Sequence, residues 1–210
     1  MSFADEIFVK RQQLKHVSTV LTHTDDTKVL TSNLTCGDKV CAVIGKVDGY
    51  CIDTSIDDKI YHVADNLYIS SQDGACNLEH LRLHKITHIV NVATGIVNQF
   101  PNEFQYKTVE ILDLPDTRID QHFAELSSFI EKGLEDGKVL VHCNAGVSRS
   151  STVVIAYLMK SKNIGLDDAF HLVKKARPTV KPNEGFWRQL KEYDLLLRQS
   201  NNPSDGRTNK

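Results

Sequence analysis

The sequence lacks a long hydrophobic run. No apolar stretch approaches the roughly 18 residues that a membrane-spanning helix needs. Residues 1–6 carry neither the apolar core of a secretion signal nor a glycine for myristoylation. We therefore expect no membrane partner. The expected location is the cytoplasm, and the nucleus is an alternative.

An excess of charge of one sign is absent too. The 210 residues carry a formal net charge of −2 at pH 7, and no basic stripe stands out. Proteins that bind nucleic acid usually show such a stripe, because they neutralise phosphate groups along the strand. The sequence therefore predicts no nucleic-acid partner.

Cysteine is scarce, and the five cysteines make an odd number. This count does not suit the disulfide framework of a small secreted protein. Cys36 and Cys41 are spaced like one half of a zinc site, but no second pair follows at ligand spacing. We therefore expect reduced thiols, no metal and no other cofactor.

The most informative segment that is present is residues 142–150, with the sequence HCNAGVSRS. An apolar segment, 139–141, precedes it, and a helical pattern, 151–159, follows it. A loop between a buried strand and a helix start offers unpaired N–H groups and the positive end of the helix dipole to an anion. Gly146 allows the loop to curl, and Arg149 can bind two phosphate oxygens at once.

We therefore expect residues 142–149 to bind a phosphate group. The residues of this predicted binding loop are His142, Asn144, Ala145, Gly146, Val147, Ser148 and Arg149, together with Cys143. A helix N-terminus beside a cation favours the thiolate form of a cysteine, so Cys143 is the expected nucleophile. Ser150 is expected to donate its hydroxyl to that sulfur, and His142 to orient the loop. A small buried cysteine of no chemical role is the simpler alternative.

The segment resembles the HCxxGxxRS signature of the cysteine-based protein phosphatases. The exact sequence of this segment, together with the YLM that follows at 157–159, resembles the atypical dual-specificity branch of that family. The resemblance extends over residues 59–198, and its other motifs are NLYIS at 66–70, ITHIVNV at 86–92, ARP at 176–178 and PNEGF at 182–186. It implies an enzyme that hydrolyses phosphotyrosine and phosphoserine or phosphothreonine through a phosphocysteine intermediate, without metal.

The resemblance also implies a carboxylic acid that protonates the departing oxygen. Asp113 and Asp116 are both candidates. In the family the acid precedes an apolar residue by six positions and an aromatic residue by ten, which Asp113 satisfies with Ile119 and Phe123. Asp113 is therefore the expected acid, although sequence alone leaves Asp116 open.

Two residues of the later motifs have alternative interpretations. The resemblance implies that Asn183 braces the phosphate-binding loop, but asparagine is also a common helix N-cap. Arg177 precedes Pro178 and is expected to mark the end of a helix rather than to contact substrate.

Strands alternate with helical patterns over residues 58–199, which predicts one α/β catalytic domain. The predicted elements include a strand at 104–111 and helices at 75–84, 121–134, 151–161 and 166–176. We expect a central mixed or parallel sheet flanked by helices on both faces. Residues 1–57 are expected to be an N-terminal extension with weak helical periodicity at 5–17 and a short strand at 40–44. Residues 200–210 are expected to be a disordered tail.

None of the variable residues of the loop is cationic, whereas the phosphoinositide phosphatases of this superfamily carry lysines there. We therefore expect a phosphoprotein substrate. The resemblance implies a place in MAP kinase signalling, with a MAP kinase or an upstream kinase as partner. The alternative is a phosphoprotein-binding signalling scaffold with weak turnover, for which residues 1–57 would supply a docking arm. Lipid, RNA or nucleotide phosphates are disfavoured by the neutral loop and the lack of a basic stripe.

Overall fold

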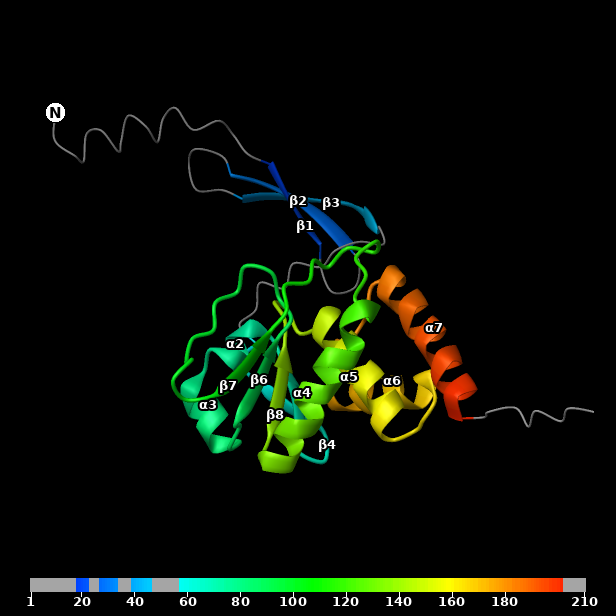
Figure 1. The fold of residues 1–210 in the computed structure, drawn as a ribbon. Helices are drawn as coiled ribbons and strands as arrows, with labels where there is room; N and C mark the ends of the chain where they lie inside the picture. Colours follow the sequence, from blue (N-terminus) through cyan, green and yellow to red (C-terminus); the bar gives the residue numbers. More distant parts are fainter. Residues whose placement is uncertain (1–17, 23–26, 34–38, 47–56, 202–210) are drawn as a thin grey trace, which may run out of the picture. The chain divides into compact units, whose positions relative to one another are not determined.

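The computed structural model describes residues 18–22, 27–33, 39–46 and 57–201. The chain divides into two compact units, Met1–Ser55 and Ile56–Lys210. In the first unit, an antiparallel sheet has the order β1 (Ser18–Thr22), β2 (Thr27–Asn33) and β3 (Lys39–Lys46) (Figure 1). The strand predicted at 40–44 lies within β3. The periodicity noted at 5–17 lies outside the described residues.

The second unit is built around a five-stranded mixed sheet, as predicted. Its strand order is β4-β5-β8-β6-β7, and only the pair β4–β5 is antiparallel. The strands are β4 (Ile60–Ala64), β5 (Leu67–Ser70), β6 (His88–Asn91), β7 (Gln105–Thr108) and β8 (Val139–His142). The strand predicted over 104–111 is therefore shorter, and the chain after Thr108 continues as a loop toward the site.

Helices cover both faces of this sheet, because successive side chains of a strand point to opposite faces. In β8, Val139 and Val141 belong to one apolar core and Leu140 to a second. The larger core includes residues of α4 (Phe123–Asp136), α5 (Arg149–Ser161), α6 (Leu166–Ala176) and α7 (Glu184–Asn201). The smaller core includes residues of α2 (Gln72–Ala75) and α3 (Leu78–Leu83). Figure 1 shows these two groups of helices on either side of the strands.

Two helix boundaries differ from the prediction. The helix expected from Ala75 onward is divided into α2 and α3, because Asn77 caps α3 by accepting a hydrogen bond from the His80 N–H at 3.1 Å. At the other end, α7 runs to Asn201, so the tail expected from residue 200 does not begin there. The remaining part of that expected tail, 202–210, lies outside the described residues.

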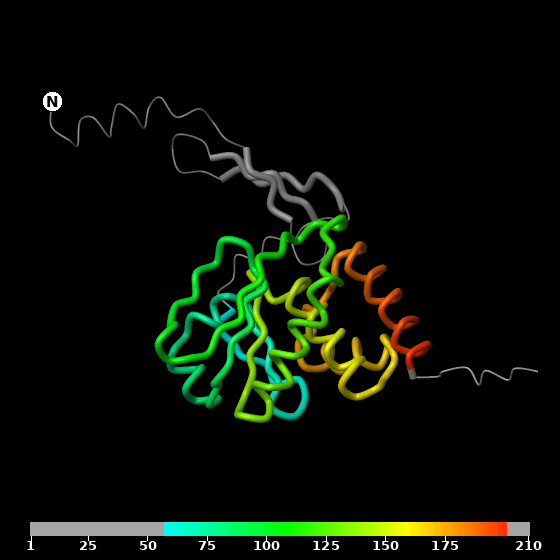
Figure 2. Tube along the Cα trace, in the orientation of Figure 1, coloured from blue at the N-terminus to red at the C-terminus, as the bar shows by residue number. Residues whose placement is uncertain are grey.

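The central position of β8 determines where the site lies. This strand is buried along its whole length between β5 and β6. The chain leaves its carboxyl end, forms a tight loop and enters α5 (Figure 2). This helix is buried from Arg149 to Met159. Because both the strand and the helix are packed in the core, the loop between them is anchored at both ends. Ligands of open α/β sheets bind at this edge.

Candidate active site

Cys143 lies immediately after β8 and is 1% exposed. Its Sγ atom is 3.3 Å from the Ser150 Oγ at the start of α5, so the structure brings together the two residues that the sequence paired. The ring of His142 lies beside them, with Nδ1 3.3 Å from the Cys143 carbonyl oxygen. Burial lowers the pKa of His142 to about 4, so this ring is neutral at pH 7. A neutral ring held against the main chain is suited to orienting the loop.

Residues 142–149, which we call the phosphate loop, are held from outside by their main-chain oxygens. Four consecutive carbonyls accept hydrogen bonds from groups beyond the loop. The donors are the N–H groups of Gln72 and Lys181, at 2.8 and 3.0 Å from the oxygens of Asn144 and Val147, and the guanidinium of Arg177, at 2.7 and 2.9 Å from those of Ala145 and Gly146. Because a trans peptide places its N–H opposite its C=O, the N–H groups that follow point toward the inside of the loop. Successive inward N–H groups form an anion-binding concavity.

Gly146 makes this curvature possible. Its φ is 69°, in the left-handed region that favours glycine. A Cβ added to it would also lie 2.6 Å from the main-chain oxygen of Ser70, at the end of β5. No other residue fits at this position without moving the loop away from the sheet.

Arg149 is the first residue of α5 and is buried. Its Nη1 donates to the main-chain oxygen of Ile111 at 3.1 Å. Its Nε lies 3.4 Å from the Asp113 Oδ2 and has no hydrogen-bond partner among the described residues. The guanidinium is therefore fixed between the phosphate loop and residues 111–117, which we call the acid loop.

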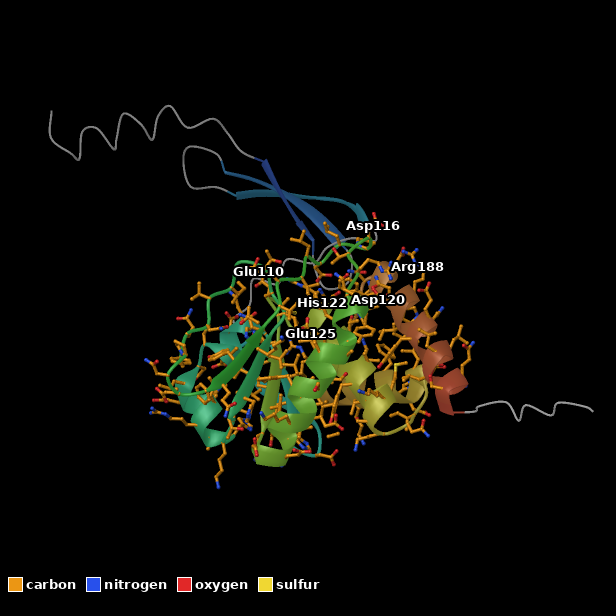
Figure 3. All side chains as sticks on the ribbon, viewed as in Figure 1. Glu110, Asp116, Asp120, His122, Glu125 and Arg188 are labelled. Atoms are coloured by element: carbon orange, nitrogen blue, oxygen red, sulfur yellow. The ribbon has the colours of Figure 1, made fainter. Side chains whose placement is uncertain are left out.

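Of the two acid candidates, the structure brings Asp113 to the phosphate loop. Its Oδ1 accepts hydrogen bonds from the Ser148 Oγ and the Asn183 Nδ2, each at 2.8 Å. Its Oδ2 faces Arg149. Asp116 is exposed and lies at the outer end of the acid loop (Figure 3).

Asn183 fulfils both interpretations that the sequence left open. Its Oδ1 accepts from the Phe186 N–H at 2.9 Å, which caps the first turn of α7. Its Nδ2 binds Asp113, and its own N–H donates to the Ser148 Oγ at 3.1 Å. One residue thus links α7 and the acid loop through its side chain, and the phosphate loop through its main-chain N–H.

The sequence did not predict that Arg177 and Gly185 contribute to the site. α6 does end at Ala176, but the side chain of Arg177 is fully buried behind the phosphate loop. Gly185 lies so close to the acid loop that an added Cβ would overlap the main chain of Pro115. The available signal for Gly185 was a glycine in the first turn of a helix, where it is otherwise unfavourable.

Within the described side chains, no group of three or more His, Cys, Asp or Glu residues could hold a metal ion. Cys36 of the Cys36–Cys41 pair lies outside the described residues. No helix in the described part of the chain is both long enough and apolar enough to cross a membrane.

Comparison with known proteins places the chain in a family. Residues 67–195 match the family model "Dual specificity phosphatase, catalytic domain". Dual specificity protein phosphatase 19 of Mus musculus is 49% identical over 148 residues, which cover 70% of this chain and 67% of the mouse protein. MAP kinase phosphatase with leucine-rich repeats protein 1 of Dictyostelium discoideum is 39% identical over 135 residues, which cover 64% of this chain but only 16% of that protein.

A solved structure shows the same fold. The human tyrosine phosphatase-like serine/threonine/tyrosine-interacting protein superposes with a TM-score of 0.63 at 35% sequence identity. The superposition covers 65% of this chain and 96% of the human one. The human protein is therefore matched over almost its whole length by part of this chain.

Proposed function

This chain belongs to the dual specificity phosphatase family, and we propose that it hydrolyses phosphotyrosine, phosphoserine and phosphothreonine in proteins through a phosphocysteine intermediate. The family membership confirms the resemblance and the enzyme class expected from the sequence. The observation that carries the mechanism is the meeting of Cys143, Arg149 and Asp113 around one loop with inward N–H groups.

In the first step the Cys143 thiolate attacks phosphorus in line with the ester oxygen. The S–P bond forms and the P–O bond to the substrate breaks. The inward N–H groups and Arg149 stabilise the charge on the other phosphoryl oxygens. Asp113 gives its proton to the departing oxygen. Its Oδ1 already accepts two hydrogen bonds, so Oδ2 is the oxygen that delivers the proton.

In the second step water hydrolyses the phosphocysteine. Asp113, now a carboxylate, takes one proton from the water as the oxygen attacks phosphorus. The S–P bond breaks and inorganic phosphate forms. The Ser150 hydroxyl, 3.3 Å from the sulfur, stabilises Cys143 as it leaves as a thiolate.

We infer a phosphoprotein substrate from the side chains of the phosphate loop. None of residues 144–148 is cationic, so the loop offers no charge for the additional phosphates of an inositol lipid. The name of the Dictyostelium relative supports a MAP kinase, or a kinase that acts upstream of one, as the partner. Such a partner would place the protein in the cytoplasm or the nucleus.

A second candidate function is a phosphoprotein-binding scaffold with weak turnover. It is favoured by the name of the human structural relative, a tyrosine phosphatase-like protein that is called an interacting protein. The same loop would then bind a phosphorylated partner without releasing phosphate. Against it stands the complete set of Cys143, Arg149 and Asp113 in this chain.

Turnover of p-nitrophenyl phosphate and of phosphotyrosine and phosphothreonine peptides, without added metal, tests the proposal. Cys143→Ser should abolish turnover of all three. Asp113→Asn should lower kcat for the phosphothreonine peptide by about 100- to 1,000-fold, because an alkoxide leaves poorly without a proton. Its effect on p-nitrophenyl phosphate should be much smaller, because nitrophenolate is a stable anion.

Asp116→Asn is the matched control, since it removes a charge from the same loop at an exposed position. It should leave all three rates unchanged. A wild type that binds the phosphopeptides without hydrolysing them would favour the scaffold. Equal losses in Asp113→Asn and Asp116→Asn would mean that the acid is assigned wrongly.

A further inference from the structure

The guanidinium of Arg177 is a buried cation behind the phosphate loop, and the residue is 1% exposed. Its Nε and Nη2 donate to the main-chain oxygens of Gly146 and Ala145, at 2.9 and 2.7 Å. One rigid fork therefore sets the direction of two adjacent peptide groups of the loop. A buried guanidinium is unfavourable unless an anion neutralises it.

Asp57 supplies that anion. Its Oδ2 accepts from the Arg177 Nη1 at 2.6 Å, and its side chain is 19% exposed. The guanidinium also lies 4.8 Å from the ring centroid of Tyr61, whose hydroxyl donates to the Asp57 Oδ1 at 3.3 Å. Burial, and then the charge of Asp57, raise the pKa of Tyr61, so its phenol stays protonated as a donor. All three side chains are thus held as one cluster.

The main chain of Asp57 is fixed as firmly as its carboxylate. Its carbonyl accepts from the Ser71 Oγ at 2.6 Å, and its N–H donates to the Asp73 Oδ2 at 3.2 Å. Ser71 is the N-cap of α2, the helix whose first N–H, that of Gln72, holds the Asn144 carbonyl of the phosphate loop. Asp57 therefore bonds directly to Arg177, which binds two loop carbonyls, and to Ser71, the neighbour of the residue that binds a third.

We propose that Asp57 and Arg177 form a positioning pair that keeps the phosphate loop in its oxyanion-binding shape, so that Asp57 is required for the reaction without touching substrate. The proposal rests on the proposed function of the same site. Without its counter-charge, Arg177 would turn toward water or another acceptor and release the carbonyls of Ala145 and Gly146. The N–H groups that those peptides aim at the phosphoryl oxygens would then lose their alignment.

Asp57→Asn in the full-length chain tests the pair, because it removes the charge and keeps the size of the side chain. We expect kcat/KM for p-nitrophenyl phosphate to fall by about 100-fold, the effect of a misplacement of about 1 Å. The dissociation constant for tungstate, a phosphate-like oxyanion, should rise at least about tenfold by calorimetry. Arg177→Lys, which keeps the charge but loses the fork, should behave in the same way.

Asp58→Asn is the matched control, because Asp58 is adjacent in sequence but faces His80 and Asn77 of the α2–α3 region. It should change neither quantity. The double variant Asp57→Asn/Arg177→Lys should lose little more than either single variant, since the two residues act as one unit. Tyr61→Phe removes only the hydroxyl donor and should give a smaller loss of tungstate affinity in the same direction.

Several outcomes would overturn the pair. If Asp57→Asn lowers only the melting temperature and the folded variant keeps wild-type tungstate affinity and kcat, the Asp57–Arg177 pair is only a structural contact. Effects of Asp57→Asn and Arg177→Lys that simply add would also overturn it. Tungstate binding requires no turnover, so a wild type that binds tungstate without hydrolysing phosphate would refute the proposed function and still test the pair. A wild type that binds no tungstate would refute both.

Discussion

At the scale of single residues, His142 has a consequence for stability. It is 3% exposed, and burial lowers its pKa from 6.5 to about 4, an effect that its hydrogen bond with the Cys143 carbonyl opposes in part. The unfolded chain takes up a proton on this ring near pH 6.5, whereas the folded chain resists it until about pH 4. Between these values the unfolded state binds more protons, so stability falls as the pH falls. The contribution of His142 is fully present above pH 6.5.

We therefore predict that His142 lowers the free energy of unfolding between pH 6.5 and pH 4 by up to about 1.4 kcal/mol for each pH unit. Urea unfolding of wild type and His142→Asn at pH 7, 6, 5 and 4.5 measures this slope. The variant should show a flatter dependence. The pKa values of Asp120 and Glu125 are also lowered in the folded chain. These carboxylates lose their stabilising effect only as the pH falls below the ordinary values of 3.8 and 4.5, so they affect mainly the lower end of the series.

His171→Asn is the control for this prediction, because His171 lies exposed on α6. It should keep the wild-type dependence on pH. If His142→Asn shows the wild-type slope as well, the buried ring is not the group that titrates.

The sequence predicted those site residues that are close together along the chain. Cys143, Arg149 and Ser150 belong to one continuous motif. Asp113 lies further away, and its role was implied by the family resemblance, whose spacing it satisfies with Ile119 and Phe123. The pairing of Asp57 with Arg177 was not predictable, because the two residues are 120 positions apart and no sequence motif connects them. Asp57 was in fact assigned to the N-terminal extension, whereas its unit begins at Ile56.

At the scale of elements, the start of α7 supports the acid loop. Gly185, the second residue of this helix, lies against the main chain of Pro115, and Asn183 just before the helix binds Asp113. Backbone contacts backbone at this point, so neither side can yield by rotating a side chain. The position of the acid therefore depends on the absence of a side chain at residue 185.

We predict that Gly185→Ala displaces the acid loop and separates Asp113 from Asn183. Turnover of the phosphothreonine peptide should fall at least about tenfold, because the proton donor is misplaced. Turnover of p-nitrophenyl phosphate should fall less, since its leaving group needs no proton. Steady-state kinetics on both substrates measures the difference.

Gly165→Ala provides the comparison for this variant. At Gly165, the N-cap of α6, an added Cβ would meet only the end of the flexible Arg198 side chain, which can move. That variant should retain turnover of both substrates. Wild-type turnover of the phosphothreonine peptide by Gly185→Ala would show that the acid loop tolerates the added methyl group.

The longer elements could be predicted because their apolar periodicity is strong. α4, α5 and α6 begin and end within about two residues of the predicted bounds, an accuracy usual for helix ends. The division between α2 and α3 was missed, since it depends on the cap at Asn77, a local hydrogen bond that competes with continuing the helix. The strands β1 and β2 were also missed, because their short segments become strands only by pairing with each other and with β3.

At the scale of the whole molecule, the chain divides into two compact units, and the candidate site is built from residues of the second one. Every residue placed in the mechanism, and Asp57 and Arg177 as well, belongs to Ile56–Lys210. The family match at residues 67–195 lies within that unit too. The described residues that form the site therefore all come from the second unit.

We predict that a fragment of residues 56–210 folds and hydrolyses p-nitrophenyl phosphate with the kcat and KM of the full chain. A fragment of residues 58–210, which lacks Asp57, should fold but lose most of that activity. Circular dichroism and steady-state kinetics on both fragments measure this. Equal activity of the two would contradict the role of Asp57, and an inactive 56–210 fragment would show that the first unit takes part in catalysis.

The outward carbonyls of the phosphate loop also bear on how this family can diversify. The loop is held by its main chain, through donors on α2, on Arg177 and at Lys181. The side chains at Asn144, Ala145 and Val147 are not what determines its shape, and none of them is fully buried. Evolution, or a protein engineer, can therefore exchange these three side chains to favour a new phosphorylated partner while the chemistry at Cys143 stays intact.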